Sequence, residues 1–291
     1  MMLCKKIDEK IADVQVWDNN SHLANIKFDG ERIQIHKSGD EVILINRRGN
    51  IKNSHYLEIV EAVQDFPYDF VIDGEMISWE DDFNLLSKRS HTKCPIKQTE
   101  LRKTHPVKFV VFDVINMFGK PLMNTPLSER IKFQHNFLVD GKIETAEYKS
   151  VMETLREARI QGREGIVIKD MNGLYENRRS DNWLKCKFWK ETTIEIVKYT
   201  SNNAGIRAED SDGNVVQISG HQHLPVKEML DGGDPVVVEI QYQEITKAGR
   251  FRMPSYRGSP TIENNIKQEI LLEKRREEAR NDMIEEAMDL K

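Results

Sequence analysis

One lysine of the sequence stands in a setting that would suit a nucleophile, within the segment 27–32, which reads KFDGER. A lysine amine attacks phosphorus or a carbonyl carbon only when it is neutral, and burial or nearby cations favour that form. Gly30 would let the backbone approach a ligand closely, and Arg32 could hold a phosphate with two parallel hydrogen bonds. Chance alone would place a K-x-D-G string in roughly one chain in ten or twenty of this length. The segment therefore gains weight only from its companions.

These companions are charged residues that stand beside short apolar runs. They are Asp73-Gly74-Glu75 after the run 70–72, Glu164-Gly165 before the run 166–168, Lys169 at the end of that run, and Lys185 and Lys187 in the segment 183–187. The two lysines of the last segment share one face of an expected strand because side chains alternate along strands. Each group alone is typical of a turn or a solvated sheet face. Together, carboxylates for a hard divalent cation and cations for phosphates predict a site for phosphoryl or nucleotidyl transfer.

The elements that must position these residues are a mixture of strands and helices without a regular βαβ alternation. Alternating apolar residues at 24–47, broken at 37–40, predict a hairpin, and the apolar runs 70–72, 109–112 and 166–168 predict buried strands. Helical periods cover 55–63 and 150–160, and Ser128 is a plausible helix cap. After residue 191, the apolar runs 194–197, 215–218 and 236–240 predict short strands between Gly and Asp turns, which together predict a small β-barrel. From Ile266 onward the chain is charged and favours a helix with a stripe of Ile266, Ile270, Met283 and Ala287.

Composition indicates a globular protein of two domains. The chain has 291 residues, of which 38% are hydrophobic and 31% charged, with no run long enough to span a membrane. Its start lacks the apolar core of a signal peptide, and its three cysteines (Cys4, Cys94, Cys186) suit neither a disulfide framework nor a four-cysteine zinc site. We therefore expect a cytoplasmic protein, in the nucleoid or a host cytoplasm.

The formal net charge of −5 at first disfavours a partner that is itself a polyanion. The charge is unevenly distributed, however. Residues 263–291 hold nine acidic and six basic side chains, whereas residues 84–108 hold seven Lys or Arg against one Glu. The second segment, with a local net charge of +6, suits phosphate contacts better than a solvated loop.

As an ordered set, these segments resemble the ATP-dependent DNA ligases within the covalent nucleotidyltransferases. The matching segments are KFDGER (27–32), Asn46-Arg47-Arg48-Gly49, IDGEMISW (72–79), FVVFDVI (109–115), EGIVIKD (164–170), Tyr175 with NRRSDNWLKCK (177–187), and VEIQYQEITKAGRFRMPSYRG (238–258). The resemblance implies an α+β fold: a nucleotidyltransferase domain of ATP-grasp-like antiparallel sheets with helices, followed by a β-barrel OB-fold domain. We expect domains at 1–190 (adenylation) and 191–262 (OB-fold), with a charged helix at 263–291. Only 26 residues precede Lys27, so the resemblance is to the minimal two-domain ligases.

By this resemblance Lys27 is the nucleophile that takes AMP from ATP. Its implied nucleotide contacts are Asn25, Ile26, Arg32, Arg47, Glu75, Phe112 (stacked on adenine), Lys185, Lys187 and Arg257. Glu75 and Glu164 would bind Mg²⁺ (or Mn²⁺). Arg257 is the best match to the family's last motif, an Arg-x-Asp-Lys run that is missing here, and Arg252 and Arg250 are its rivals.

The implied partner is nicked duplex DNA, bound by a monomer. Its expected contacts are Arg47, Lys88, Arg89, Lys93 and Lys97. Two alternatives stay open: an RNA ligase or capping guanylyltransferase with the same chemistry, and a non-catalytic single-strand binder built on the barrel. The stretch 178–187 favours DNA ligase over the first, and residues 192–260 lack the regular aromatic platforms that the second needs.

Overall fold

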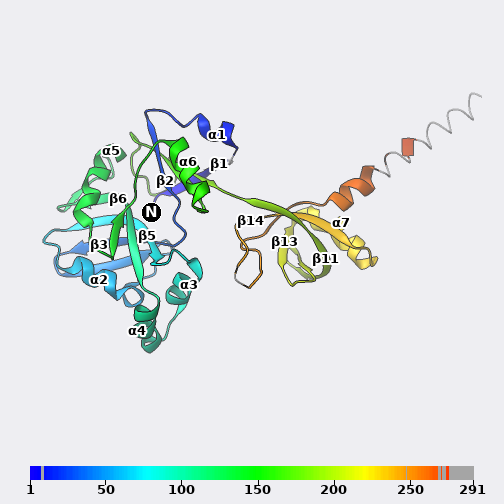
Figure 1. Ribbon diagram of the computed structural model, residues 1–291, viewed down its shortest axis with the longest axis horizontal. Helices are drawn as coiled ribbons and strands as arrows, with labels where there is room; N and C mark the ends of the chain where they lie inside the picture. The colour runs from blue at the N-terminus through cyan, green and yellow to red at the C-terminus, as the bar shows by residue number, and fades with distance from the viewer. Residues whose placement is uncertain (8–9, 247, 268–269, 271–272, 275–291) are drawn as a thin grey trace, which may run out of the picture. The chain divides into compact units, whose positions relative to one another are not determined.

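The chain folds into two compact units, Met1–Phe188 and Trp189–Lys291. The computed structural model describes residues 1–7, 10–246, 248–267, 270 and 273–274 (Figure 1). No helix within those residues is long and apolar enough to cross a membrane.

The larger unit contains two sheets. Its strands are β1 (Leu3–Ile7), β2 (His22–Ile26), β3 (Glu31–Ser38), β4 (Glu41–Asn46), β5 (Phe70–Ser78), β6 (Val107–Met117), β7 (Lys120–Pro121), β8 (Ile143–Thr145), β9 (Gly165–Asp170) and β10 (Arg179–Lys187). One sheet has the order β4-β3-β5-β6-β7 with β8 beside β6, and the other has the order β1-β10-β9-β2. All pairs are antiparallel except β1 with β10 and β6 with β8.

Helices of the larger unit cover the outer faces of these sheets. They are α1 (Ile11–Gln15), α2 (Leu57–Gln64), α3 (Phe83–His91), α4 (Pro95–Thr104), α5 (Leu127–Arg130) and α6 (Val151–Ile160), with 3-10 turns at Asn53–His55 and Ile131–Phe137. The period of 151–160 buries Val151, Leu155 and Ala158 against the smaller sheet. Ser150 caps α6 by accepting a hydrogen bond from the Glu153 amide. Ser128, predicted as a cap, is instead the second residue of α5, and Pro126 stands at its N-cap, where proline's fixed φ suits the chain's entry into a helix.

Besides the apolar core of each sheet, a further apolar cluster joins the two sheets and lies beside the charged residues singled out by the sequence. It contains Ile77 of β5, Phe112 of β6 and Trp183 of β10, with Met2 and Tyr175 from the connecting segments. Three strands that are distant in sequence therefore meet at one place. The predicted buried runs at 70–72, 109–112 and 166–168 all lie in strands, which confirms that part of the sequence prediction.

The smaller unit is a five-stranded antiparallel sheet with one helix. Its strands are β11 (Lys190–Asn202), β12 (Gly205–Asp210), β13 (Val215–Ser219), β14 (Val236–Tyr242) and β15 (Ser255–Gly258), in the order β13-β12-β11-β14-β15, and α7 (His223–Asp231) packs against their core. The runs at 194–197, 215–218 and 236–240 are strands, as predicted. Residues 260–267 are helical, so the predicted charged helix begins before residue 263, and its positions Met283 and Ala287 lie outside the described residues.

Candidate active site

The larger unit holds a cavity of about 250 Å³ where its two sheets meet. The residues that line it are Leu3, Cys4, Asn25, Ile26, Lys27, Phe28, Arg32, Arg47, Glu75, Phe112, Val167, Lys169, Arg179, Trp183, Lys185 and Lys187. Lys27 and the eight residues of this unit that were predicted to contact the nucleotide are all among them. Arg257 belongs to the smaller unit, where it lies exposed on β15.

Two glycines let the backbone segments of the site approach each other. A Cβ atom at Gly30 would lie 2.1 Å from the carbonyl oxygen of Met76, and one at Gly165 would lie 2.0 Å from that of Cys186. The amide of Lys27 donates to the carbonyl of Gly165 at 2.9 Å. The sequence segments KFDGER and EGIVIKD are therefore adjacent in space. A side chain at Gly30 would push KFDGER away from β5, and one at Gly165 would push EGIVIKD away from β10.

The amine of Lys27 lies in an ion pair with Glu164, whose other oxygen is 2.6 Å from Nζ of Lys187. Burial alone would raise the pKa of Glu164, but Lys27 and Lys187 outweigh it and lower this pKa to about 2. Glu164 is therefore a carboxylate throughout the working range of pH. Two cations share this one buried anion, so together they form a site with an excess of positive charge for phosphate groups.

The second carboxyl group of the site, Glu75, favours its protonated form. Burial raises the pKa of Glu75 to about 8, even though Lys27 and Arg32 pull it down. Within the described ranges, no group of three or more His, Cys, Asp or Glu side chains is arranged to hold a metal ion. Once Glu75 has lost its proton, it and Glu164 can supply hard oxygen ligands, which suits a cation that takes its other ligands from substrate phosphates and water.

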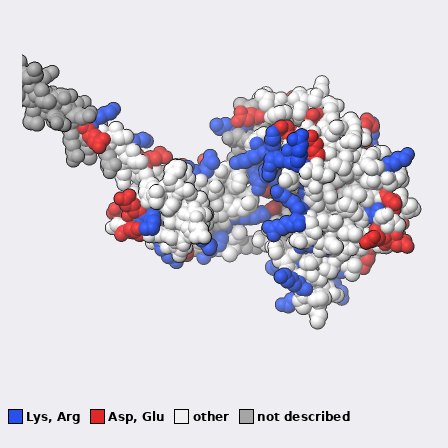
Figure 2. Space-filling view, turned by 180° about the vertical axis from the view of Figure 1, so that it is seen from behind, with Lys and Arg blue, Asp and Glu red and all other residues white. Residues whose placement is uncertain are grey.

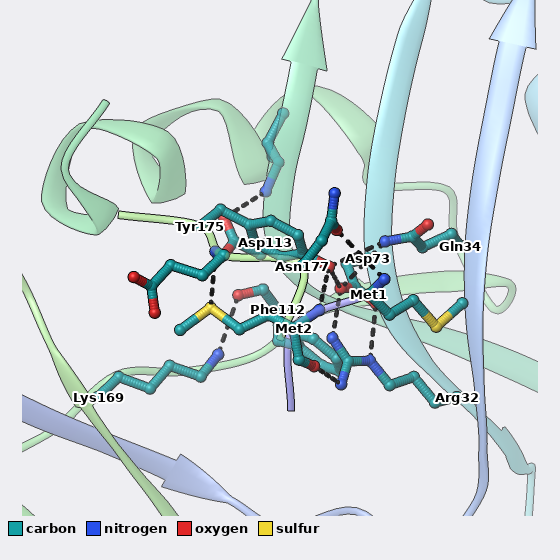
Figure 3. Close-up of polar contacts among 12 residues, drawn as sticks. Met1, Met2, Arg32, Gln34, Asp73, Phe112, Asp113, Lys169, Tyr175 and Asn177 are labelled. Atoms are coloured by element: carbon teal, nitrogen blue, oxygen red, sulfur yellow. Dashed lines mark hydrogen bonds and ion pairs between the residues drawn. The ribbon is translucent and has the colours of Figure 1, made fainter. Parts of the chain in front are cut away.

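Arg32 is held by a buried polar network behind the cavity (Figure 3). Its Nε and Nη2 donate to the two oxygens of Asp73 at 3.0 and 2.6 Å, and the Tyr175 hydroxyl donates to the same carboxylate at 2.6 Å. Arg32 also donates to the carbonyl of Met2. Neither Asp73 nor Tyr175 was predicted to support the site. Asp73 stands two residues before Glu75, and Tyr175 stands between two of the segments that match the family, so both positions were conspicuous. The hydrogen bond between Asp73 and Tyr175 joins residues 102 positions apart and could not be predicted.

Lys169 forms part of the cavity wall as a buried lysine among aromatic rings. Its Nζ lies 4.6 Å from the ring centre of Phe112 and 4.3 Å from that of Trp183, and it donates to the Phe112 carbonyl at 3.2 Å. Burial lowers the pKa of Lys169 to about 7. Lys169 thereby fixes both the backbone and the ring of Phe112, the residue predicted to stack on a base.

The basic segment 84–108 forms α3 and α4, and Figure 2 shows Lys and Arg side chains gathered on the visible face of the larger unit. Lys88, Lys93 and Lys97 are exposed. Arg89 is not: its side chain is 2% exposed and forms two hydrogen bonds with Glu58. The prediction of Arg89 as a DNA contact is therefore wrong. Its guanidinium is buried in an ion pair with Glu58, and the sequence did not reveal this partner.

In the smaller unit, the two rivals of Arg257 have protein partners. Nη1 of Arg252 is 3.0 Å from Glu244, and Nη1 of Arg250 lies 2.6 Å from the position that a Cβ atom would take at Gly213. The assignment of the last motif to Arg257 stays a prediction.

Comparison with known proteins gives a consistent family. A sequence profile described as "ATP dependent DNA ligase domain" matches residues 1–187. The chain is 27% identical over 266 residues to the SPbeta prophage-derived DNA ligase-like protein LigB of Bacillus subtilis, covering 82% of this chain and 93% of that protein. It is 29% identical over 301 residues to DNA ligase 2 of Methanosarcina acetivorans, covering 86% of this chain and 52% of that enzyme. The chain thus spans most of the first relative but about half of the second.

Solved structures share the fold. The ligase domain of LigD from M. tuberculosis superposes with a TM-score of 0.57 at 19% identity, over 89% of this chain and 94% of that domain. A structure of the Lig E DNA ligases gives a TM-score of 0.63 at 16% identity, over 89% of this chain and 98% of that one. These likenesses confirm the predicted fold class, a nucleotidyltransferase domain followed by an OB-fold β-barrel.

Proposed function

The chain belongs to the family of ATP-dependent DNA ligases, and from this premise we propose that it seals nicks in duplex DNA through AMP carried on Lys27. The observation that carries the proposal is the position of the Lys27 amine, in a cavity of about 250 Å³ beside Glu164 and Lys187. In the domain scheme that we propose, residues 1–190 perform adenylation, 191–262 form the OB-fold domain and 263–291 a charged helix.

In the first step the Lys27 nitrogen would attack the α-phosphorus of ATP. A nitrogen–phosphorus bond forms and the bond to pyrophosphate breaks. The lysine ammonium gives up two of its three protons, one before the attack and one as the phosphoramidate forms, to water or to the departing pyrophosphate. Lys27 must first leave its ion pair with Glu164, because an amine held by a carboxylate keeps its proton. Lys185 and Lys187 would stabilise the charge that grows on the α-phosphate oxygens, and Arg257 would orient the pyrophosphate.

Glu75 and Glu164 would hold Mg²⁺ or Mn²⁺ together with the phosphates, and the bound cation would polarise the phosphate oxygens. In the second step AMP would pass from Lys27 to the 5′-phosphate at the nick. In the third, the 3′-hydroxyl would attack that phosphate and release AMP. Arg47 and the cavity residue Arg179, which the sequence analysis did not assign, are the cations that we propose for the 5′-phosphate.

We propose that Asn25 selects adenine. Its Nδ2 donates to the Ile26 carbonyl at 2.8 Å, and its Oδ1 is buried with no hydrogen-bond partner among the residues that the structure describes. A lone acceptor in the cavity wall fits the amino group of adenine and repels the carbonyl oxygen of guanine. We expect Asn25→Ala to raise the KM for ATP in adenylation by about tenfold while GTP stays unchanged or improves. Equal losses with both nucleotides would contradict this role.

We propose that the exposed lysines of α3 and α4 bind the DNA backbone. Replacing Lys88, Lys93 and Lys97 by alanine should weaken binding of a nicked duplex, and should lower the slope of log Kd against log salt by about 0.9 for each phosphate that the variant no longer binds. The slope is measured by fluorescence anisotropy across a salt series. Replacing the exposed lysines Lys120 and Lys132 is the matched control. An unchanged slope in the triple variant would show that these lysines are only a solvated face.

Labelled ATP and nicked substrates test the proposed function. Wild-type protein incubated with ATP labelled on the α-phosphate should form a covalent protein–AMP adduct and then seal nicked duplex DNA. Preferential sealing of nicked RNA would favour the RNA ligase alternative, and the absence of an adduct would favour a non-catalytic binder. We also propose that the protein acts as a cytoplasmic monomer, which predicts a mass near 33.9 kDa in gel filtration.

A further inference from the structure

The turn that carries Arg47 is shaped by the side chain of Asn46. The Oδ1 atom of Asn46 accepts the amides of Arg48 and Asn50, each at 3.0 Å, and its backbone bonds to Asn50 and Gly49 close the loop. Gly49 has a φ of 83°, which favours glycine. Arg47 thus lies at a fixed place in the turn, and from there it reaches the cavity.

Asn46 is in turn held by Glu31, a residue of the KFDGER segment for which the proposed chemistry has no use. Its Oε1 accepts from Nδ2 of Asn46 at 2.8 Å and lies 3.2 Å from Nζ of Lys52. Its Oε2 accepts from the Tyr56 hydroxyl at 2.7 Å and from the Ser90 hydroxyl at 2.9 Å. Four donors from three segments of the chain, the Arg47 turn, the 3-10 turn at Asn53–His55 and α3, therefore meet at one carboxylate.

Glu31 does not touch the cavity. Successive residues of a strand point to opposite faces of the sheet, so Arg32 faces the cavity and Glu31 faces the core beneath α2 and α3. The donors lower the pKa of Glu31 although burial opposes them, so the side chain is a carboxylate. Tyr56 is fully buried, and the side chains of Asn46 and Ser90 are nearly so. Removing the carboxylate would leave these donors unsatisfied, and the turn would lose its attachment.

From these contacts we propose that Glu31 is a positioning residue, which sets Arg47 against the 5′-phosphate of the nick by holding Asn46. The inference rests on the proposed function and deepens it. It also ties the Arg47 turn to α3 through Ser90, so that one carboxylate joins the nucleophile segment, the phosphate-binding turn and the start of the basic segment.

A double-mutant cycle tests this role. Enzyme loaded with AMP is mixed with nicked DNA, and the rate of AMP transfer to the 5′-phosphate is measured in a single turnover. Glu31→Ala should slow the transfer by about tenfold, and Glu31→Ala combined with Arg47→Ala should be no slower than Arg47→Ala alone by more than about twofold. If the two losses multiply, Glu31 acts independently of Arg47 and the inference is overturned.

A reciprocal exchange separates positioning from a general loss of structure. Asn46→Asp alone places two carboxylates face to face and should slow the transfer like Glu31→Ala. Adding Glu31→Gln to Asn46→Asp places an amide donor opposite one oxygen of the new carboxylate. The second oxygen of that carboxylate can still accept the amides of Arg48 and Asn50. The rate should therefore recover to within about threefold of wild type. No recovery in a variant with a normal melting temperature would overturn the inference.

Glu129→Ala, at an exposed ion pair with Lys132, is the control that should leave the rate unchanged. The outcomes also separate the role of Glu31 from the proposed function on which it rests. A wild-type protein that forms no AMP adduct would contradict the proposed function itself. An active wild type with multiplying losses in the cycle would contradict the role of Glu31 alone.

Discussion

Lys27→Arg is expected to reduce the labelled protein–AMP adduct to background. A guanidinium keeps the positive charge beside Glu164 but stays protonated at every working pH, so it has no lone pair with which to attack phosphorus. Lys27→Ala should lose the adduct as well, because it has no amine, while Lys187 keeps its ion pair with Glu164. Adduct formation is measured with labelled ATP on a denaturing gel, alongside the melting temperature of each variant.

The third step provides the control for this prediction. A nick that already carries AMP on its 5′-phosphate needs no lysyl-AMP, so Lys27→Arg should still seal it to a measurable extent. Loss of that activity together with a lowered melting temperature would mean that the substitution disturbs the fold. Robust adduct formation by Lys27→Arg would rule out Lys27 as the nucleophile.

The cavity residues were predicted from the family resemblance, and for some of them the local spacing also gave a physical reason. Lys185 and Lys187 lie two residues apart on a strand, which directs both to one face whatever the rest of the fold does. The segments that carry Lys27 and Glu164 each contain a glycine that permits the close approach of two backbones. In these cases the local pattern and the tertiary arrangement agree.

Interactions that depend on distant partners could not be predicted in the same way. Arg89 lies in a strongly basic segment, and only the fold shows that Glu58 takes its charge into the core. In the sequence, Glu31 is only an acidic residue of a turn-like segment. Its role depends on the hydrogen bonds from Asn46, Tyr56 and Ser90, which the fold places around it. Strand β12 was missed because the polar residues of Gly205–Asp210 hide the apolar alternation that only Ile206 and Ala208 supply.

The fully buried ion pair between Asp113 and Arg130 is the site where a single substitution should cost the most stability. Both side chains are 0% exposed, and Nε and Nη2 of Arg130 each donate to the carboxylate at 2.8 Å. Arg130 also donates to the carbonyls of Thr125 and Gly173. It thereby joins β6, which carries Phe112, to the segment that leads to Tyr175 and β10, two walls of the cavity.

Asp113→Ala should lower the free energy of unfolding by about 3–5 kcal/mol, because it leaves a guanidinium buried without its counter-charge. For a unit of this size that corresponds to a fall in melting temperature of roughly 10 °C, measured by calorimetry. ATP should also bind more weakly, since β6, which carries Phe112, loses its link through Arg130 to the Gly173 segment that leads to Tyr175.

The double variant Asp113→Leu with Arg130→Met decides whether charge or packing explains the loss. It removes both charges and keeps apolar volume, so it should be more stable than Asp113→Ala, although the carbonyls of Thr125 and Gly173 lose their donor and prevent full recovery. If the double variant is as unstable as the single one, then removing the unpaired charge brings no gain, and the loss comes from the broken link between Asp113, Arg130 and the Gly173 segment. In that case the cost lies in the connection between the cavity walls, and ATP affinity should fall in step with stability in both variants.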